Sequence, residues 1–193
     1  REEMDDYSIE SLRRANAAIE SGAFDGEVVP VTFSARKGDV TVEHDEQPGK
    51  GRPDKIPQLR PAFAKDGTIT AATSSSISDG AAAVVLTRES VAKENGQEPV
   101  AKIVAMAAHA QEPSEFTVAP IGAIEKVLDK AGWSADEVDL WEVNEAFACV
   151  AMFAMRDIGI PHEKINVNGG GTALGHPIGA SGTRIIVTLL HAL

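Results

Sequence analysis

Residues 166–182 read NVNGGGTALGHPIGASG, a glycine-rich stretch with one imidazole, His176, in its middle. An apolar run, 164–167, precedes this stretch, and an apolar helix-like run, 180–193, follows it. A glycine-rich turn between a strand and a helix lets the backbone approach a ligand closely and presents a side chain at the edge of a sheet. Histidine is well suited to move protons near neutral pH, so we interpret His176 as a candidate catalytic residue, although a structural histidine remains equally open from the residues alone.

Hydrophobic periodicity and turn residues predict alternating strands and helices around this motif. The predicted helices cover 2–20, 89–95, 120–131, 145–158 and 180–193, and Gly22 can end the first of them. The predicted strands cover 28–34, 40–44, 68–71, 81–87, 100–107, 140–143 and 165–168. The first two are joined by a turn at 36–39, and 46–61 is expected to be loop. This alternation predicts an α/β fold with right-handed crossovers.

Composition limits the kinds of partner that the chain can have. The 193 residues are 43% hydrophobic and 24% charged, as in ordinary globular proteins, and the formal net charge of −11 argues against nucleic acid and anionic membranes as partners. No signal peptide is visible, and the single cysteine, Cys149, fits a reducing compartment, so we expect a cytoplasmic protein. No metal-ligand cluster, P-loop or dinucleotide fingerprint appears, so we expect neither a metal nor a cofactor.

One basic loop departs from the acidic balance of the chain. It lies among prolines and glycines and contains Lys50, Arg52, Lys55 and Arg60. A solvated loop and an anion site are both compatible with this pattern. Two further residues have plain structural interpretations: Asn144 is placed to cap the helix predicted at 145, and Cys149 lies among apolar residues, where a thiol is usually inert.

Three motifs in order carry a resemblance to a known family. They are LRPAF at 59–63 with GTITA at 67–71 and SDGAAA at 78–83, then WEVNEAFA at 141–148, and then the stretch 166–182. Together they resemble the thiolase family, most closely its biosynthetic acetyl-CoA acetyltransferase branch, and the resemblance runs essentially from residue 1 to 193. It implies a layered α/β architecture in which 1–77 form a coenzyme A-binding loop region, 78–96 end the N-terminal half, and 97–193 form most of the C-terminal half.

The resemblance implies Claisen condensation of two acetyl-CoA molecules, or thiolysis of acetoacetyl-CoA, through a cysteine thioester. A degradative 3-ketoacyl-CoA thiolase and a non-catalytic acyl-CoA-binding module are the alternatives. The two cysteine motifs of the family are missing, so we expect an internal piece that is inactive alone, with the nucleophile outside it. The intact protein is expected to act in lipid metabolism as a homodimer or homotetramer, with acyl-CoA thioesters as substrates.

The resemblance also implies roles for individual residues. His176 would deprotonate the nucleophilic cysteine and hold the thioester oxygen as it becomes enolate-like, and Asn144 would hold a water that completes this oxyanion hole. Glu145 and Gly175 would support the site. The coenzyme A contacts would come from Arg52 and Lys55 at the nucleotide, Ser75 at the pantetheine arm, and Ala146 and Phe147 along the acyl path.

Overall fold

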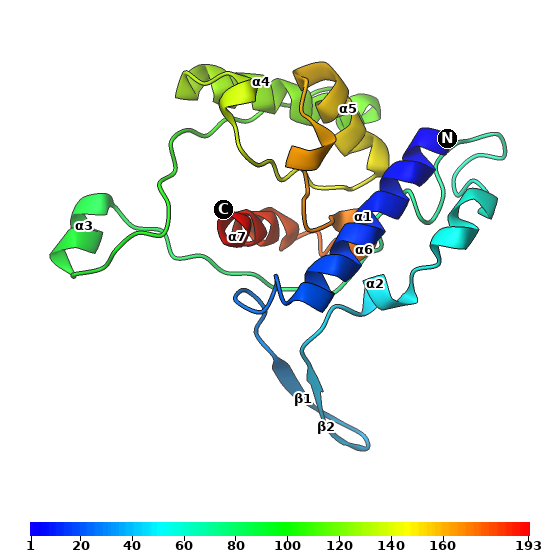
Figure 1. Cartoon of the computed structure of the whole chain (residues 1–193), viewed down its shortest axis with the longest axis horizontal. Helices are drawn as coiled ribbons and strands as arrows, with labels where there is room; N and C mark the ends of the chain where they lie inside the picture. Colours follow the sequence, from blue (N-terminus) through cyan, green and yellow to red (C-terminus); the bar gives the residue numbers. More distant parts are fainter.

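The computed structural model describes residues 1–193 and begins with one long helix, α1 (Glu2–Ser21), which crosses the body of the molecule (Figure 1). Gly22 ends α1 in the left-handed conformation, with φ 76°, and its N–H donates to the carbonyls of Ala18 and Ile19. The helix predicted at 2–20 is therefore confirmed. Its buried face carries small and polar residues beside apolar ones: Asp5, Tyr7, Ser8, Ser11, Leu12, Ala15 and Ala18.

The remaining helices follow in chain order and are mostly short. They are α2 (Glu46–Lys50), α3 (Glu89–Glu94), α4 (Ala119–Ala131), α5 (Ala148–Ile158), α6 (Gly171–Leu174) and α7 (Ser181–Ala192). Four 3₁₀ turns join them: η1 (Pro53–Gln58), η2 (Pro113–Val118), η3 (Ala135–Glu137) and η4 (His162–Lys164). The predictions of α3, α4 and α7 are confirmed to within a residue or two.

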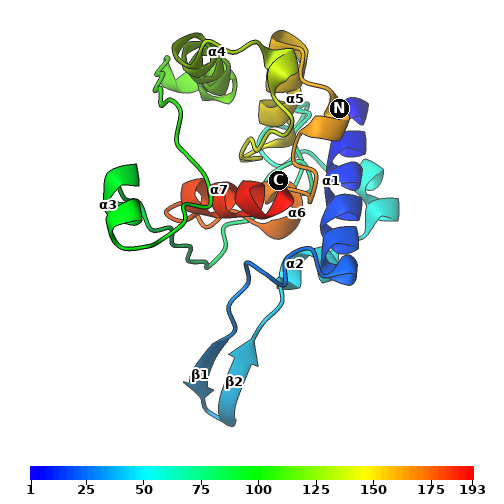
Figure 2. The same ribbon diagram turned by 60° about the vertical axis from the view of Figure 1, so that its left-hand side comes forward.

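A two-stranded antiparallel hairpin projects from the body (Figures 1 and 2). It consists of β1 (Val31–Ala35) and β2 (Gly38–Val42), with Phe33 opposite Val40. Paired residues share a face of the ribbon, so one face is apolar and the other carries hydroxyl groups and a carboxylate. The predicted hairpin is confirmed with shifted bounds: β1 begins three residues later than expected, and β2 begins and ends two residues earlier than the predicted 40–44.

The main core lies where α1 and α5 meet the segments on either side of η4 (Figure 2). Its buried members are Tyr7, Val143, Ala148, Val150, Ala151, Ala154, Ile160 and Ile165. A second, smaller cluster joins α1 to α6 through Leu12, Ala15 and Ala173. The second cluster fixes the glycine-rich stretch against α1, and the first holds Ile165, directly before that stretch, which places the candidate site beside the longest helix.

The two strands predicted at 140–143 and 165–168 meet in parallel at one bridge only, between Trp141 and Ile165. Beyond the bridge, the side chain of Asn166, and not the backbone of a second strand, hydrogen-bonds to the backbone of Val143. Its Oδ1 accepts the Val143 N–H at 2.8 Å, and its Nδ2 donates to the Val143 carbonyl at 2.8 Å. Asn166 adopts a left-handed conformation, with φ 46°, which turns the chain away and prevents a longer ladder.

Several predicted elements are wrong. The segment 46–61, expected to be loop, contains α2 and η1. The runs 68–71 and 81–87, expected to be buried strands, and 100–107, expected to be a strand, are not strands, and Val85 is 96% exposed. A strand requires partners for its N–H and C=O groups, and these runs have none beyond a single bridge between Pro61 and Thr70.

The helix predicted to begin at Glu145 begins instead at Ala148, so Asn144 does not cap it. Residues 144–148 are extended or turned because they hydrogen-bond to a neighbouring segment. The Ala148 N–H donates to the Thr73 carbonyl at 3.0 Å, and the Ser75 N–H donates to the Ala146 carbonyl at 3.1 Å. This pairing competes with the first helical turn and leaves the Asn144 side chain free to reach the candidate site.

Candidate active site

His176 and Asn144 are neighbours in the structure. The amide nitrogen of Asn144, Nδ2, lies 3.3 Å from Nε2 of His176. On the opposite side of the ring, Nδ1 of His176 lies 2.6 Å from the hydroxyl of Ser181, the first residue of α7. The imidazole is therefore held at both nitrogens, by groups from two different parts of the chain.

The segment 73–78 connects the two motifs that supply these residues. Along one edge it pairs with 146–148, and along the other the His176 N–H donates to the Ser76 carbonyl at 2.9 Å. Gly175 makes this approach possible: it has φ 95°, and a Cβ at this position would overlap the Ser78 hydroxyl. The predicted supporting role of Gly175 is thus to let the histidine loop lie directly against 76–78.

Glu145 is fully buried and is the acceptor for four side chains and one backbone amide. Its Oε1 accepts from the Tyr7 hydroxyl and from Asn166 Nδ2, both at 2.8 Å. Its Oε2 accepts from the Ser11 hydroxyl at 2.8 Å and from the Thr172 N–H and hydroxyl at 3.1 and 2.6 Å. A buried carboxylate is tolerated only when its lone pairs are satisfied in this way. Glu145 therefore ties α1 to the glycine-rich stretch, next to Asn144.

Two glycines are required by this packing. Gly170 lies so close to Glu145 that a Cβ there would overlap the carboxylate, and a Cβ on Gly169 would come within 2.6 Å of the Ser11 carbonyl. Arg14 supports the same stretch from α1: its Nη1 donates to the Ile165 carbonyl at 2.7 Å and its Nη2 to the His162 carbonyl at 3.1 Å. The loop before His176 is thus anchored to α1 by both a carboxylate and a guanidinium.

The Oδ1 atom of Asn144 is buried and has no hydrogen-bond partner within the protein. A buried amide oxygen without a partner is costly, and an ordered water is the common way to satisfy it. The arrangement can therefore place a proton acceptor, Nε2 of His176, and an amide able to hold water at one point.

The predicted acyl-path residues lie next to Asn144. Phe147 packs against Phe63, with ring centroids 6.0 Å apart, and against Phe116, at 5.8 Å. The Ser75 hydroxyl donates to the Ala146 carbonyl at 2.9 Å, so only its lone pairs remain for another partner. Phe63 and Phe116 were not identified from the sequence as part of the site, because nothing in the local sequence indicates that they meet Phe147.

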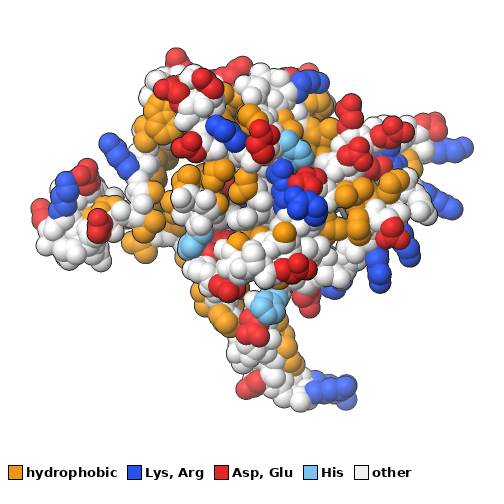
Figure 3. All heavy atoms as spheres, viewed as in Figure 1, with side chains coloured by type: hydrophobic (Ala, Val, Ile, Leu, Met, Phe, Trp, Pro, Cys, Tyr) orange, Lys and Arg blue, Asp and Glu red, His pale blue; other side chains and the backbone are white.

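The predicted nucleotide-binding residues lie on η1 and just before it. Arg52 and Lys55 are exposed, and neither side chain forms an ion pair or hydrogen bond, whereas Lys50 pairs with Glu46 at 3.4 Å. Arg1 holds η1 in place through hydrogen bonds to the carbonyls of Ile56, Pro57 and Leu59, at 3.3, 3.4 and 3.1 Å. Lys and Arg side chains stand along the side of the molecule where α2 and η1 lie (Figure 3).

Cys149 lies on α5, half-buried, and burial raises the pKa of its thiol. A thiol with a raised pKa carries little of the thiolate that nucleophilic catalysis needs, which supports the inert interpretation.

Glu142 is also buried, and its burial raises the pKa of its carboxyl group to about 8. The guanidinium of Arg184, 3.7 Å away, offsets this effect only in part.

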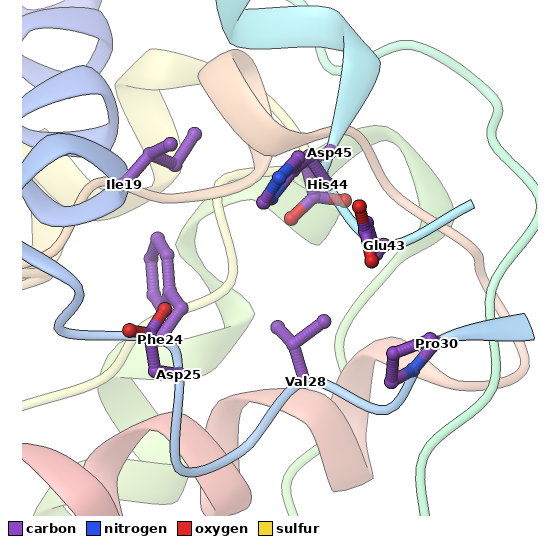
Figure 4. A pocket seen from close by; sticks show the side chains of 8 residues that line it. All are labelled: Ile19, Phe24, Asp25, Val28, Pro30, Glu43, His44 and Asp45. Carbon is purple, nitrogen blue, oxygen red and sulfur yellow. The ribbon is translucent and has the colours of Figure 1, made fainter. Parts of the chain in front are cut away.

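A separate cavity of about 290 Å³ lies between the end of α1 and the base of the hairpin (Figure 4). Ile19, Phe24, Asp25, Val28, Pro30, Glu43, His44 and Asp45 line it. It contains neither His176 nor Asn144 and is not part of the candidate site.

No group of three or more His, Cys, Asp and Glu side chains is arranged to hold a metal ion. None of the helices combines the length and the apolar character that crossing a membrane requires.

Comparison with known proteins defines the family. Residues 1–90 match the family model described as the N-terminal domain of thiolase, and residues 97–193 match the C-terminal domain. An acetyl-CoA acetyltransferase of Yarrowia lipolytica is 51% identical over 193 residues, which are 100% of this chain and 49% of the relative. The chain belongs to the thiolase family, as its motifs predict.

Solved structures confirm the predicted fold. The crystal structure of the Bacillus anthracis acetyl-CoA acetyltransferase has a TM-score of 0.97 and 43% identity, covering 100% of this chain and 49% of that one. The Acat5 thiolase of Ascaris suum, in complex with coenzyme A, has a TM-score of 0.90 and 40% identity, covering 100% and 50%. The thiolase-like α/β architecture is therefore confirmed, and the chain spans about half the length of the relatives it matches.

Proposed function

We propose that this chain supplies the histidine–asparagine site and the coenzyme A contacts of an acetyl-CoA C-acetyltransferase. The observation that carries the proposal is the contact between Nε2 of His176 and the amide of Asn144, at 3.3 Å. Nε2 is the nitrogen that can take a proton from a thiol, and the asparagine beside it can hold a water near a developing oxyanion. The likeness to acetyl-CoA acetyltransferases along the whole chain supports this activity.

In the proposed reaction, His176 accepts the proton of a cysteine thiol that lies outside these 193 residues. The thiolate attacks the carbonyl of acetyl-CoA, an S–C bond forms, and the thiolate of coenzyme A leaves. His176 then gives its proton to the leaving coenzyme A thiolate. A second acetyl-CoA loses a proton from its methyl carbon to the thiolate of the family's second cysteine, which also lies outside these residues, and the resulting enolate attacks the thioester carbonyl. A C–C bond forms, the nucleophilic cysteine leaves as a thiolate and takes up that proton, and the product is acetoacetyl-CoA.

The protein side of the second step rests on His176 and Asn144. Once Nε2 carries a proton it becomes a donor, which can stabilise the thioester oxygen as that oxygen gains negative charge. Asn144 adds a bound water as a second donor and contributes no charge that would repel an enolate. Its unpartnered Oδ1 supports this role.

Coenzyme A is proposed to bind along the exposed side of the same region. Arg52 and Lys55 have no partners within the protein, so their charges are available for the phosphates of the nucleotide. Ala146 and Phe147 border the acyl and pantetheine path, and the Ser75 hydroxyl, which donates to the Ala146 carbonyl, keeps its lone pairs to accept a hydrogen bond from that arm. The Ascaris suum relative, crystallised with coenzyme A, supports this ligand class.

The organisation of the chain follows the same proposal. Residues 1–77 form the coenzyme A-binding region, 78–96 end the N-terminal half, and 97–193 begin the C-terminal half; the match of the C-terminal family model from residue 97 supports the last boundary. We further propose a cytoplasmic homodimer or homotetramer in lipid metabolism, with coenzyme A thioesters as substrates and no separate cofactor.

An assay of acetoacetyl-CoA thiolysis by the protein encoded in the complete reading frame tests the proposal. We expect turnover that His176→Ala abolishes and that Thr183→Ala, a change on α7 at a residue that forms no hydrogen bond to the imidazole, preserves. The 193-residue chain alone is expected to be inactive. A preference for long 3-ketoacyl-CoA substrates would favour a degradative thiolase, and coenzyme A binding without turnover would favour a binding module; either result would contradict the proposal.

A further inference from the structure

Ser181 makes the shortest contact to the imidazole of His176. Its hydroxyl oxygen lies 2.6 Å from Nδ1 and 3.1 Å from the carbonyl oxygen of Pro177, and the residue is 2% exposed. It stands five positions after His176, on the first turn of α7. Because a hydroxyl can donate or accept, this contact fits either tautomer of the ring, and the partner of the other ring nitrogen decides between them.

The direction of each hydrogen bond follows from the groups involved. In the orientation of the Asn144 amide, Nδ2 faces the ring and can only donate, so Nε2 of His176 accepts and is unprotonated in the neutral ring. The proton of the neutral ring then lies on Nδ1, which donates to the Ser181 oxygen. The hydroxyl proton of Ser181 is left for the Pro177 carbonyl, which is within reach. The three bonds form one chain in which every donor has an acceptor.

We propose that Ser181 is a positioning residue that keeps the proton of neutral His176 on Nδ1 and so leaves Nε2 unprotonated, with a lone pair that can take a proton in place of the Asn144 hydrogen bond. A free neutral imidazole carries its proton mainly on Nε2, so this tautomer requires a stabilising partner. The catalytic meaning of the inference rests on the proposed function, whereas the tautomer itself does not.

The local backbone holds Ser181 in the position that this role needs. The Ser181 N–H donates to the Pro177 carbonyl at 2.9 Å, and the Ala180 N–H donates to the same carbonyl at 2.8 Å, so residues 177–181 form a closed turn. Once Nε2 takes a proton, it gives up the hydrogen bond from the Asn144 amide, whereas the Nδ1–H bond to Ser181 persists. The ring can therefore accept and return a proton without rotating.

Nitrogen-15 NMR of the 193-residue chain tests the tautomer directly, because protonated and bare ring nitrogens have well-separated chemical shifts. The spectra are recorded at a pH at which the His176 ring is found to be neutral, because only the neutral ring has two tautomers. We expect the wild-type ring to be protonated on Nδ1. Ser181→Ala should shift the population toward Nε2–H, Ser181→Thr should restore Nδ1–H, and Thr183→Ala should leave the tautomer unchanged.

Two results would overturn the inference: a wild-type ring protonated on Nε2, or a Ser181→Ala ring that keeps its proton on Nδ1. The wild-type spectrum decides the first point even if Ser181→Ala fails to fold. In the protein encoded by the complete reading frame, Ser181→Ala should lower kcat for thiolysis about tenfold to a hundredfold, by analogy with groups that orient metal-bound histidines, with little change in KM and with rescue by threonine. A tautomer shift in a protein without thiolase activity would leave the inference standing and contradict the proposed function.

Discussion

The amide nitrogen of Asn144 and Nε2 of His176 lie 3.3 Å apart, although 32 positions separate the two residues in the chain. Two features bring them together. The side chain of Asn166 holds the backbone of Val143 through two hydrogen bonds, and the segment 73–78 pairs with both motifs. The contact therefore depends on how the backbone is paired around it, as well as on the identities of the two residues.

We predict that replacing the carboxylate of Glu145, which accepts all the hydrogen bonds at this position, destabilises the fold. Each carboxylate oxygen accepts at least two hydrogen bonds, so Glu145→Gln must place an NH₂ group against donors, whichever way the amide points. We expect a loss of about 3 kcal/mol or more in the free energy of unfolding, and about 1.5–3 kcal/mol for Tyr7→Phe, which removes one donor to a charged group. Urea unfolding measures both losses. A larger loss for Tyr7→Phe than for Glu145→Gln would contradict this account.

We predict that Gly170 cannot be replaced by alanine without cost, because the added methyl group would overlap the Glu145 carboxylate. The expected loss of unfolding free energy is about 1–3 kcal/mol, the usual cost of overpacking a filled site. Gly179→Ala is the matched control, since nothing lies within 4 Å of the Cβ it would add. Thermal and urea unfolding should show the difference; equal effects of the two substitutions would mean that the loop yields to accommodate the methyl group.

We predict a decrease in stability with rising pH that depends on Glu142. The pKa of its buried carboxyl group is raised from 4.5 to about 8, chiefly by burial. Between these values the folded chain keeps a proton that the unfolded chain releases, so stability falls as pH rises from about 5 to about 8. Glu142→Gln should remove this part of the slope and stabilise the chain at pH 8 by on the order of a few kcal/mol relative to the wild type.

Urea unfolding at pH 5, 6, 7 and 8 measures the slope, with Glu163→Gln, a change at an exposed carboxylate, as the control. At pH 5 the wild type and Glu142→Gln should be nearly equally stable, because the carboxyl group is then neutral in the fold. Parallel curves for these two proteins over the whole range would show that Glu142 is ionised in the folded chain.

The helices were predictable because their signals are local. Gly22 and Gly132 end α1 and α4 in the left-handed conformation, as their positions after apolar helical repeats indicate. The strands predicted at the apolar runs 81–87 and 100–107 are wrong, because an apolar run forms a strand only where a neighbouring strand pairs with its N–H and C=O groups. The late start of α5 has the same origin, since pairing with 73–75 competes with its first turn.

The candidate site was predictable in part. The setting of His176 and the family motif around Asn144 indicated the two residues that the structure brings together. The partners of Glu145 were not predictable, since Tyr7 and Ser11 come from 138 and 134 positions away. Ser181 was missed for a different reason: a serine at the start of a helix has an ordinary local explanation, and only the course of the turn at 177–181 brings it to Nδ1 of His176.

We predict that the basic loop, rather than the net charge of −11, governs affinity for coenzyme A thioesters. In the protein encoded by the complete reading frame, Arg52→Ala with Lys55→Ala should raise KM for acetyl-CoA and weaken its dependence on salt, because charge-assisted contacts to phosphate are lost. KM for a pantetheine thioester without the nucleotide should stay nearly constant. Equal increases in the two KM values would mean that the loop acts on folding or on the pantetheine path.

The most direct test of the central claim, that His176 and Asn144 form the reacting site, resolves the two chemical steps. In the protein encoded by the complete reading frame, rapid-quench kinetics measure acyl-enzyme formation and its condensation with a second acetyl-CoA. His176→Ala should slow both steps, because the histidine generates the thiolate and also holds the oxyanion. Asn144→Ala should slow mainly condensation, by roughly a hundredfold to a thousandfold. Small and equal effects of the two substitutions on both steps would contradict the assignment of the site.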